Sequence, residues 1–274
     1  MEFIEVADRV WVQRHEWFDL NLTVIAGTTG VAVIDTGASE LFGRGLRDQV
    51  RALTSTPLIA VVNTHEHFDH TLGNAAFDDV AIIAHETAAA NTPEAAVRGI
   101  AETVDDVRAD EIRSSRIVPA TETFASVRAL DLGERQIELV HPGRGHTGGD
   151  IVALIPDADL LIAGDLIEES APPAYGPDSF PLEWAASLDL VSSLAPAARY
   201  VPGHGAVVDA AFVAEQRDQI ATVAETIRIL AADGVRADAV LDSGTWPFPR
   251  EALRHAVARG WAQLPRGSLR LPMA

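Results

Sequence analysis

The chain has 274 residues, 47% of them hydrophobic, and carries 40 acidic against 21 basic side chains, for a formal net charge of −19. This hydrophobic content suffices for a folded core and excludes a disordered chain. The acidic excess repels phosphate backbones and so disfavours nucleic acid as a partner. There is no cysteine and every basic residue is arginine. Disulfides, thiolate metal sites, cysteine nucleophiles and Schiff-base lysines are therefore excluded.

The N-terminal residues alternate like a strand and lack a basic, apolar leader with a small-residue cleavage site. No apolar run approaches the roughly 20 residues that a membrane-spanning helix requires. We therefore expect a soluble, cytoplasmic protein that does not bind membranes.

The first half of the chain predicts strands followed by helices. Apolar runs bounded by turn residues indicate the strands, and Ser39 is a typical N-cap before apolar residues at helical spacing. We expect strands at 10–14, 22–27, 31–35 and 58–63, a helix after Ser39 that Pro57 terminates, and a helical stretch at 94–112.

The second half repeats this scheme. In each half an apolar strand ends in an aspartate (Asp35 or Asp165), and after a helix another strand leads into a histidine (His65 or His204). Mixed strands in two series with flanking helices predict two packed sheets with helices outside. We expect strands at 127–130, 136–141, 151–155, 160–163 and 199–201, and helices at 182–194, 212–232 and 250–264.

Five of the nine histidines lie in three short loops that follow or join apolar runs. The first loop, 64–70, reads Thr-His-Glu-His-Phe-Asp-His, and the other two carry His146 and His204. Alternation along an extended segment places the first two histidines of 64–70 on one side. The aspartate and the last histidine of this loop come where the chain turns away, so they can point at a neighbouring position.

Imidazole and carboxylate groups are the ligands that zinc accepts where no thiolate exists. Three histidines leave one open position on a first metal ion, and the remaining ligands suit a second ion with one aspartate bridging the pair. The first set is His65, His67 and His146, the second is Asp69, His70 and His204, and the bridging residue is Asp165. We expect two divalent ions, zinc in the first place, with iron or manganese as alternatives.

This pattern resembles the signature of the metallo-β-lactamase superfamily of metallo-hydrolases. The family's five motifs run as a strand-ending Asp, HxHxDH, a lone His, a bridging Asp and a final His. They match Asp35 in Ile-Asp-Thr-Gly, the 65–70 cluster, His146 in Gly-His-Thr-Gly, Asp165 in Ala-Gly-Asp and His204 in Pro-Gly-His-Gly.

The resemblance implies a fold of class α+β, a four-layer αββα sandwich with a dinuclear site at one edge of its sheets. We expect one domain over 1–274, with a C-terminal helical segment from about 209 to 274. The resemblance also implies that Asp69 is both a metal ligand and the catalytic group that orients the attacking water. Asp35 is implied to be a buried structural residue and not a ligand.

The reaction implied is hydrolysis by a metal-bound hydroxide of an ester, thioester or lactone of a small acyl substrate. Asp165 in place of a cysteine is similar to the glyoxalase II and lactonase branch, although lysine anchors for glutathione do not exist here. A β-lactam is the alternative substrate. Two other classes stay open, a mononuclear iron sulfur dioxygenase and a non-catalytic binding protein, and a homodimer is an option.

Candidate substrate contacts lie in three loops. Trp17 and Phe18, between two N-terminal strands, either cover an apolar substrate or staple their hairpin to the core. Tyr175 is a hydrogen-bond donor in a turn-rich loop after Asp165, or part of a rigid connection. Arg144 either binds an anionic group or forms a surface salt bridge.

Two further patterns are assigned no functional role. The segment 143–148 formally matches GxGxxG, but a strand is predicted after it where a dinucleotide fingerprint requires a helix. Four histidines match no motif position: His15, His85, His141 and His255.

Overall fold

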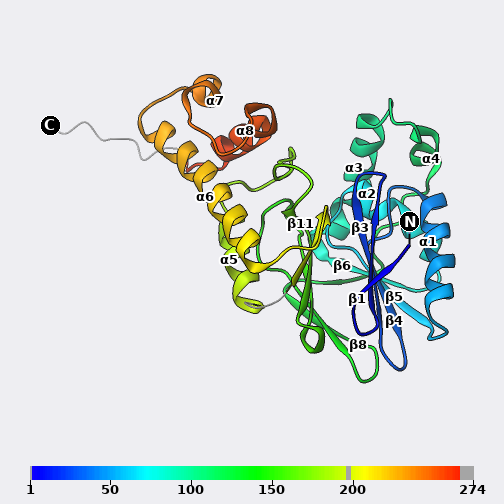
Figure 1. Cartoon of the computed structure of the whole chain (residues 1–274). Coiled ribbons are helices and arrows are strands. Elements are labelled where there is room, and N and C mark those ends of the chain that lie inside the picture. The colour runs from blue at the N-terminus through cyan, green and yellow to red at the C-terminus, as the bar shows by residue number, and fades with distance from the viewer. Residues whose placement is uncertain (1, 196–198, 266–274) are drawn as a thin grey trace.

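The computed structural model describes residues 2–195 and 199–265. Figure 1 shows two halves, each a set of strands covered on its outer side by helices. The first half contains β1 (Ile4–Ala7), β2 (Val10–His15), β3 (Leu20–Ala26), β4 (Val31–Ile34), α1 (Glu40–Leu53), β5 (Leu58–Val62), α2 (Phe68–Thr71), β6 (Ala81–His85), α3 (Glu86–Glu102), α4 (Ala109–Ser114) and β7 (Glu122–Phe124).

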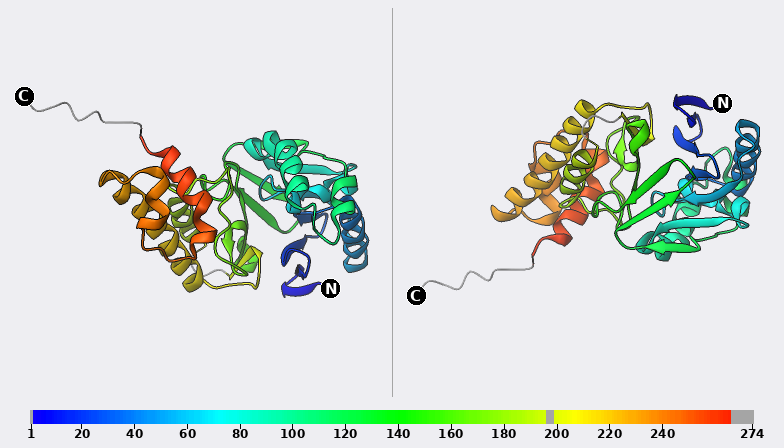
Figure 2. Two further views of the ribbon diagram at one scale, coloured as in Figure 1. Left: turned by 90° about the horizontal axis from the view of Figure 1, so that it is seen from above. Right: turned by 90° about the horizontal axis from the view of Figure 1, so that it is seen from below.

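The second half begins after β7 and ends with helices stacked beside its strands (Figure 2). It contains β8 (Val127–Asp131), β9 (Gln136–Val140), β10 (Val152–Ile155), β11 (Leu160–Glu168), α5 (Trp184–Leu194), β12 (Arg199–His204), α6 (Ala210–Ala232), α7 (Val240–Ser243) and α8 (Arg254–Gln263). None of the helices within the described residues is long and apolar enough to cross a membrane.

Hydrogen bonds connect the strands in the order β7-β6-β5-β4-β3-β12-β11-β10-β9-β8, with β1 and β2 off this path. The two halves meet between β3 and β12, where only the pair His204–Leu20 is in register. The repeated pattern of the sequence, a strand ending in aspartate and a later strand leading into histidine, forms one pair of parallel strands in each half. These pairs are β4 with β5 and β11 with β12. Asp35 and Asp165 therefore emerge at matching places in the two halves.

The period-2 alternation of the strands builds three apolar layers. Along β4, Val31 and Val33 pack into the layer beneath α1, whereas Ala32 and Ile34 face the opposite sheet. Residues of β10 and β11 divide in the same way between the inter-sheet layer and the layer beneath α5, α6 and α8. These layers give the order helix, sheet, sheet, helix, so the predicted metallo-β-lactamase-like fold is confirmed.

The helical stretch expected at 94–112 differs in the structure. Helix α3 begins at Glu86, because the His85 side chain accepts a hydrogen bond from Thr87 N and caps it, and the helix continues through Pro93. Turns separate α3 from α4. The short strands β6 and β7 were not predicted, and the expected C-terminal helical segment extends beyond the described residues.

Candidate metal centre

The seven candidate ligands converge on one end of the two sheets from four parts of the chain. His65 and His67 lie in the extended segment after β5, and the short helix α2 then turns Asp69 and His70 inwards. His146 lies in the loop between β9 and β10. The two remaining ligands, Asp165 and His204, lie on the neighbouring strands β11 and β12.

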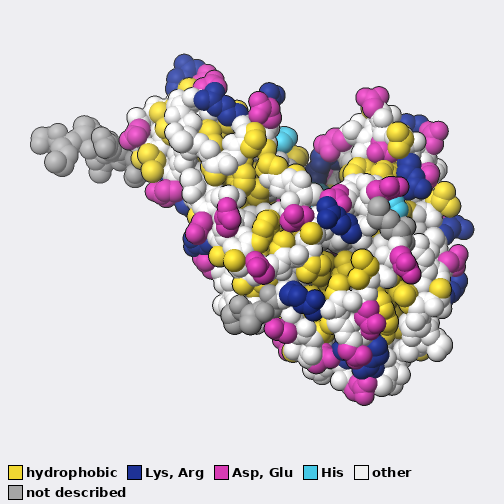
Figure 3. Space-filling view, viewed as in Figure 1, with side chains coloured by type: hydrophobic (Ala, Val, Ile, Leu, Met, Phe, Trp, Pro, Cys, Tyr) yellow, Lys and Arg dark blue, Asp and Glu magenta, His cyan; other side chains and the backbone are white. Residues whose placement is uncertain are grey.

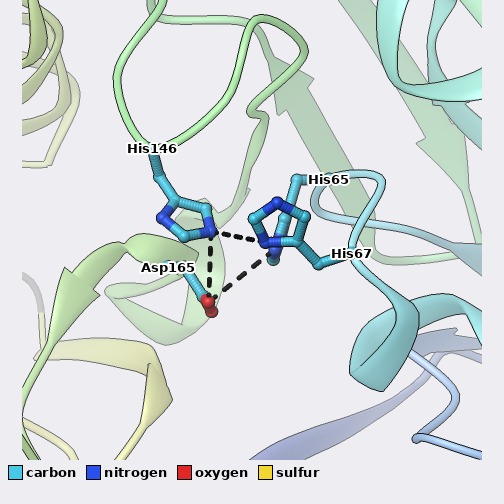
Figure 4. A group of neighbouring side chains, drawn as sticks. All are labelled: His65, His67, His146 and Asp165. Carbon is cyan, nitrogen blue, oxygen red and sulfur yellow. Dashed lines mark hydrogen bonds and ion pairs between the residues drawn. The ribbon is translucent and has the colours of Figure 1, made fainter. Parts of the chain in front are cut away.

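Two groups form, and within each group the ligand atoms lie within 4.8 Å of one another. Figure 4 shows the first, with the imidazoles of His146 and His65 directed towards the Asp165 carboxylate and His67 against His146. The groups are His65, His67, His146 and Asp165, and Asp69, His70 and His204.

Asp165 contacts both groups. Its Oδ2 lies 3.4 Å from His146 Nε2 and 3.3 Å from His204 Nε2, and its Oδ1 lies 3.1 Å from His70 Nε2. Ligands bonded at 2.0–2.1 Å in a tetrahedron are separated by about 3.3 Å. Since these separations match that spacing, the Asp165 carboxylate would be able to bind an ion together with histidines of either group. Gly203 makes the approach feasible, because a Cβ there would lie 1.8 Å from Asp165 Oδ1.

In each of the five imidazoles, one ring nitrogen donates a hydrogen bond to an acceptor that lies outside the candidate metal centre. Carbonyl and carboxylate oxygens only accept, so this nitrogen carries the proton and the other keeps a lone pair. Thr64 Oγ1 accepts in the same way, because its own proton goes to Asp35. The pairs are His65 Nδ1 with Thr64 Oγ1, 3.0 Å; His67 Nε2 with Asp178 Oδ2, 3.1 Å; His70 Nδ1 with Asp35 Oδ2, 2.8 Å; His146 Nδ1 with Ala174 O, 2.8 Å; and His204 Nδ1 with Phe18 O, 2.7 Å.

The inward nitrogens therefore face one another. His146 Nε2 lies 2.8 Å from His67 Nδ1, and His70 Nε2 lies 3.3 Å from His204 Nε2. Two lone pairs at these distances repel unless a proton or a metal ion lies between them. Moreover, the buried His65 Nε2 has no hydrogen-bond partner in the described chain. The residues present thus fit a pair of divalent ions.

The charges of the centre point the same way. Burial lowers the pKa of His204, but Asp165 and Asp69 outweigh it and raise that pKa to about 10. Burial likewise raises the pKa of Asp165, yet the surrounding histidines bring it well below its ordinary value. Burial lowers the pKa of His146 to about 4 against the pull of Asp165. The surroundings therefore favour a protonated, positively charged imidazole at His204, beside Asp69, and a neutral, metal-binding imidazole at His146.

An ion pair that the sequence did not reveal fixes His67. The carboxylate of Asp178 accepts from His67 and forms an ion pair with the Arg98 guanidinium. Burial opposes ionisation of Asp178, but its bonds to His67 and Arg98 bring its pKa far below the ordinary range. Asp178 therefore remains an anion that orients a candidate ligand, and no local motif identifies it.

A cavity of about 500 Å³ opens onto the two groups, a volume within the range of small-molecule sites. Figure 3 shows the surface hollowed between the C-terminal helices and the side carrying α3 and α4. Besides the candidate ligands, the cavity is lined by Phe18, Glu102, Glu168, Ser170, Ala174, Tyr175, Gly176, Pro177 and His255.

The structure brings two of the four candidate substrate residues to this cavity, Phe18 and Tyr175. Trp17 is not among its lining residues, because its Nε1 donates to Asp106 at 3.2 Å and the Arg108 guanidinium lies 4.5 Å above its ring. Arg144 forms an ion pair with Glu183 at 2.6 Å and covers Phe180. In this structure Trp17 therefore staples its hairpin to neighbouring residues, and Arg144 forms a surface salt bridge.

Three lining residues with ionisable side chains had no predicted role. Glu168 is the last residue of β11, three positions after Asp165, and it extends the strand beyond its predicted end. Glu102 ends α3 and His255 lies on α8. A carboxylate so soon after a candidate ligand was a usable signal for Glu168, whereas only tertiary structure brings Glu102 and His255 to the cavity.

The model of the metallo-beta-lactamase superfamily matches residues 16–204. A metallo-beta-lactamase type 2 of Bacillus cereus is 27% identical over 198 residues, 69% of this chain and 68% of that protein. The human acyl-coenzyme A thioesterase MBLAC2 is 30% identical over 186 residues, 59% of this chain and 64% of that protein. A solved metallo-beta-lactamase from Pontibacter korlensis shares the fold, with a TM-score of 0.65, 20% identity and coverage of 80% of this chain and 98% of its own.

The chain therefore belongs to the metallo-β-lactamase superfamily. Its two His/Asp groups are typical of a dinuclear metal site in this family, as expected of a metal-dependent hydrolase of the superfamily.

Proposed function

We propose that this protein is a dinuclear metallo-hydrolase that cleaves the ester, thioester or lactone bond of a small acyl substrate. One observation carries the proposal: five imidazoles, each held from outside, turn their free nitrogens towards two carboxylates at the floor of a cavity of about 500 Å³. When bound there, divalent ions supply the Lewis acidity that polarises a carbonyl and lowers the pKa of water.

The chain's own residues supply position and proton transfer. Asp69 lines the cavity, and its Oδ2 lies 3.5 Å from His204 Nε2. A carboxylate in this place can orient a water molecule and accept its proton. Phe18 and Tyr175 line the cavity beside it and restrict water around the acyl group.

Support for a carbonyl substrate comes from two directions. The place of Asp165 between the two groups is similar to the glyoxalase II and lactonase branch, and a thioesterase is among the relatives. The likeness to a type 2 metallo-beta-lactamase over 198 residues favours a β-lactam as the second candidate substrate.

A mononuclear iron sulfur dioxygenase would need only one group of ligands. The second group, Asp69, His70 and His204, supports two ions and therefore hydrolysis. All candidate donors are imidazole nitrogens or carboxylate oxygens. These ligands suit zinc best, and iron and manganese are the alternative ions.

The test is a panel of p-nitrophenyl esters, N-acetylcysteamine thioesters, γ-lactones and a chromogenic cephalosporin, assayed with zinc-loaded protein and with the His67→Ala variant. We expect turnover of at least one carbonyl class and none above background in the variant. Greatest activity on the cephalosporin would support the second candidate instead. Oxygen consumption with a persulfide substrate, and no hydrolysis, would contradict the proposal.

A further inference from the structure

The cavity wall is unusually acidic once the ligands are set aside. Two carboxylates remain, Glu102 and Glu168, and no arginine is found among the described lining residues. The chain contains no lysine at all. The exposed His255 on α8 is the one lining group, apart from the ligands, that can carry positive charge.

Both carboxylates have oxygens that the protein does not use. Glu168 is 4% exposed, and its Oε1 accepts from Ser170 N at 3.1 Å and from Ser170 Oγ at 2.6 Å. Burial and the nearby Asp165 raise the pKa of Glu168 to about 7, so this side chain is a full anion only above that pH. Glu102 is exposed at the end of α3 and forms no ion pair with a described residue.

Nearby arginines do not neutralise this wall. Arg98 forms an ion pair with Asp178. Arg259 donates to Ser179 O at 3.1 Å and lies over Phe180. Both cations are therefore held beside the cavity by other partners, and a bound substrate meets the carboxylates directly.

One residue of the cavity wall, Tyr175, carries a buried hydroxyl without a partner in the described part of the chain. Tyr175 is 6% exposed, and its hydroxyl has no hydrogen-bond partner among the described residues. Its ring is held against Trp184, with 5.0 Å between centroids. Leaving a buried hydroxyl unpaired is costly, so an acceptor outside the described chain, a water molecule or a substrate oxygen, would pair with it.

We infer that the cavity accepts acyl substrates whose acyl chain is neutral or positively charged, and that Glu102 and Glu168 discriminate against anionic chains. This inference rests on the proposed function and narrows its substrate class. Bound ions would attract a negative group to the reacting end, so the discrimination concerns the part of the substrate that extends away from the centre towards α3 and α8. Like charges juxtaposed in a binding site suppress the wrong partner.

The test uses three p-nitrophenyl esters of nearly equal shape: 4-(trimethylammonio)butanoate, 5,5-dimethylhexanoate and 4-sulfobutanoate. With metal-loaded wild-type protein at pH 8.5, where the Glu168 carboxyl is ionised, we expect kcat/KM for the cationic ester to equal or exceed that for the neutral one. The anionic ester should be at least tenfold poorer than the neutral one at low salt, and the difference should shrink in 0.5 M NaCl because salt screens the carboxylates.

Single substitutions show whether Glu102 and Glu168 cause the dependence of kcat/KM on the charge of the ester. Glu102→Gln and Glu168→Gln keep the shape and should each raise the anionic-to-neutral ratio of kcat/KM at least threefold. Glu225→Gln, on the exposed side of α6, removes the same charge away from the cavity and should leave the ratio unchanged. His255→Gln should also preserve the order.

Binding of the matching 4-nitroanilides, measured by calorimetry, reports the same order without turnover. If binding shows the order but no ester is cleaved, the inference stands and the proposed reaction fails. If esters are cleaved with no dependence on charge, or if the double variant E102Q/E168Q keeps the wild-type ratio, the inference is wrong while the proposed reaction stands.

Discussion

The carboxylate of Asp35 lies 2.8 Å from Nδ1 of His70, and it also accepts hydrogen bonds from the amide and the hydroxyl of Thr64. Asp35 is buried, and its backbone has a left-handed φ of 61°. One side chain at the end of β4 therefore orients His70 directly and His65 through Thr64. Both candidate metal groups depend on it.

We predict that Asp35→Asn weakens metal binding and lowers the free energy of unfolding by about 1–3 kcal/mol, because an amide cannot accept from three buried donors. Asparagine tolerates a left-handed φ, whereas alanine does not. Asp35→Ala should therefore lose roughly 1 kcal/mol more, measured by urea denaturation. Wild-type metal affinity and stability in the asparagine variant would contradict this role.

Asp178 should act on metal affinity through His67. Asp178→Asn removes the anion that orients this imidazole, and such outer partners are worth about 10–100-fold in metal affinity. Competition with a chelating dye measures the change. Asp189→Asn is the control, because Asp189 forms a similar ion pair with Arg217 on the surface. Equal affinities in the two variants would show that Asp178 has no such role.

Tyr175→Phe should lower kcat/KM for neutral esters about tenfold and leave metal content unchanged, because it removes one hydroxyl donor from the cavity wall. Burial raises the pKa of this phenol well above its ordinary value, so it remains a donor throughout the assay range. The loss should therefore be independent of pH between 6 and 9. A loss that appears only at one end of this range would contradict the assignment.

Asp150 gives the stability of the fold a pH dependence. It is buried and accepts from the amide and hydroxyl of Thr147 in the loop that carries His146. Burial raises its pKa to about 7 from an ordinary value of 3.8. The folded state therefore binds the proton of Asp150 more tightly than the unfolded state does. This proton contributes fully to the free energy of unfolding below about pH 4, and its contribution is lost as pH rises through about 7.

We expect Asp150→Asn to gain stability relative to wild type on going from pH 5 to pH 8, by on the order of 2–4 kcal/mol. Urea midpoints of both proteins at each pH measure this difference. Parallel pH curves for the two proteins would show that Asp150 does not carry the effect.

Periodic and local features of the sequence predicted most of the fold. Ser39 caps α1 by accepting from Phe42 N, as its position before an apolar helical pattern indicated. The strand-helix-strand echo of Asp35 and Asp165 appears as two parallel strand pairs. The short strand β7 could not be predicted, because its three residues, two exposed and one half-buried, carry no periodic signal and pairing with β6 alone defines them.

The candidate ligands could be predicted because their residue types and spacing are set by metal chemistry. The residues that hold and surround them follow different rules. Asp178 and Arg98 lie 80 positions apart and meet only in the folded chain. Trp17 was a candidate as an aromatic residue of the N-terminal hairpin and Arg144 as a basic residue close to His146, but tertiary partners hold both away from the cavity.

The content of bound metal tests the central claim most directly. We predict that the purified chain, loaded with zinc and dialysed, contains two ions by plasma mass spectrometry. His67→Ala and His204→Ala should each hold fewer ions, abolish hydrolysis and keep the wild-type circular dichroism spectrum. A wild-type chain that binds no ion, or variants with undiminished content, would contradict the metal centre on which the proposed reaction depends.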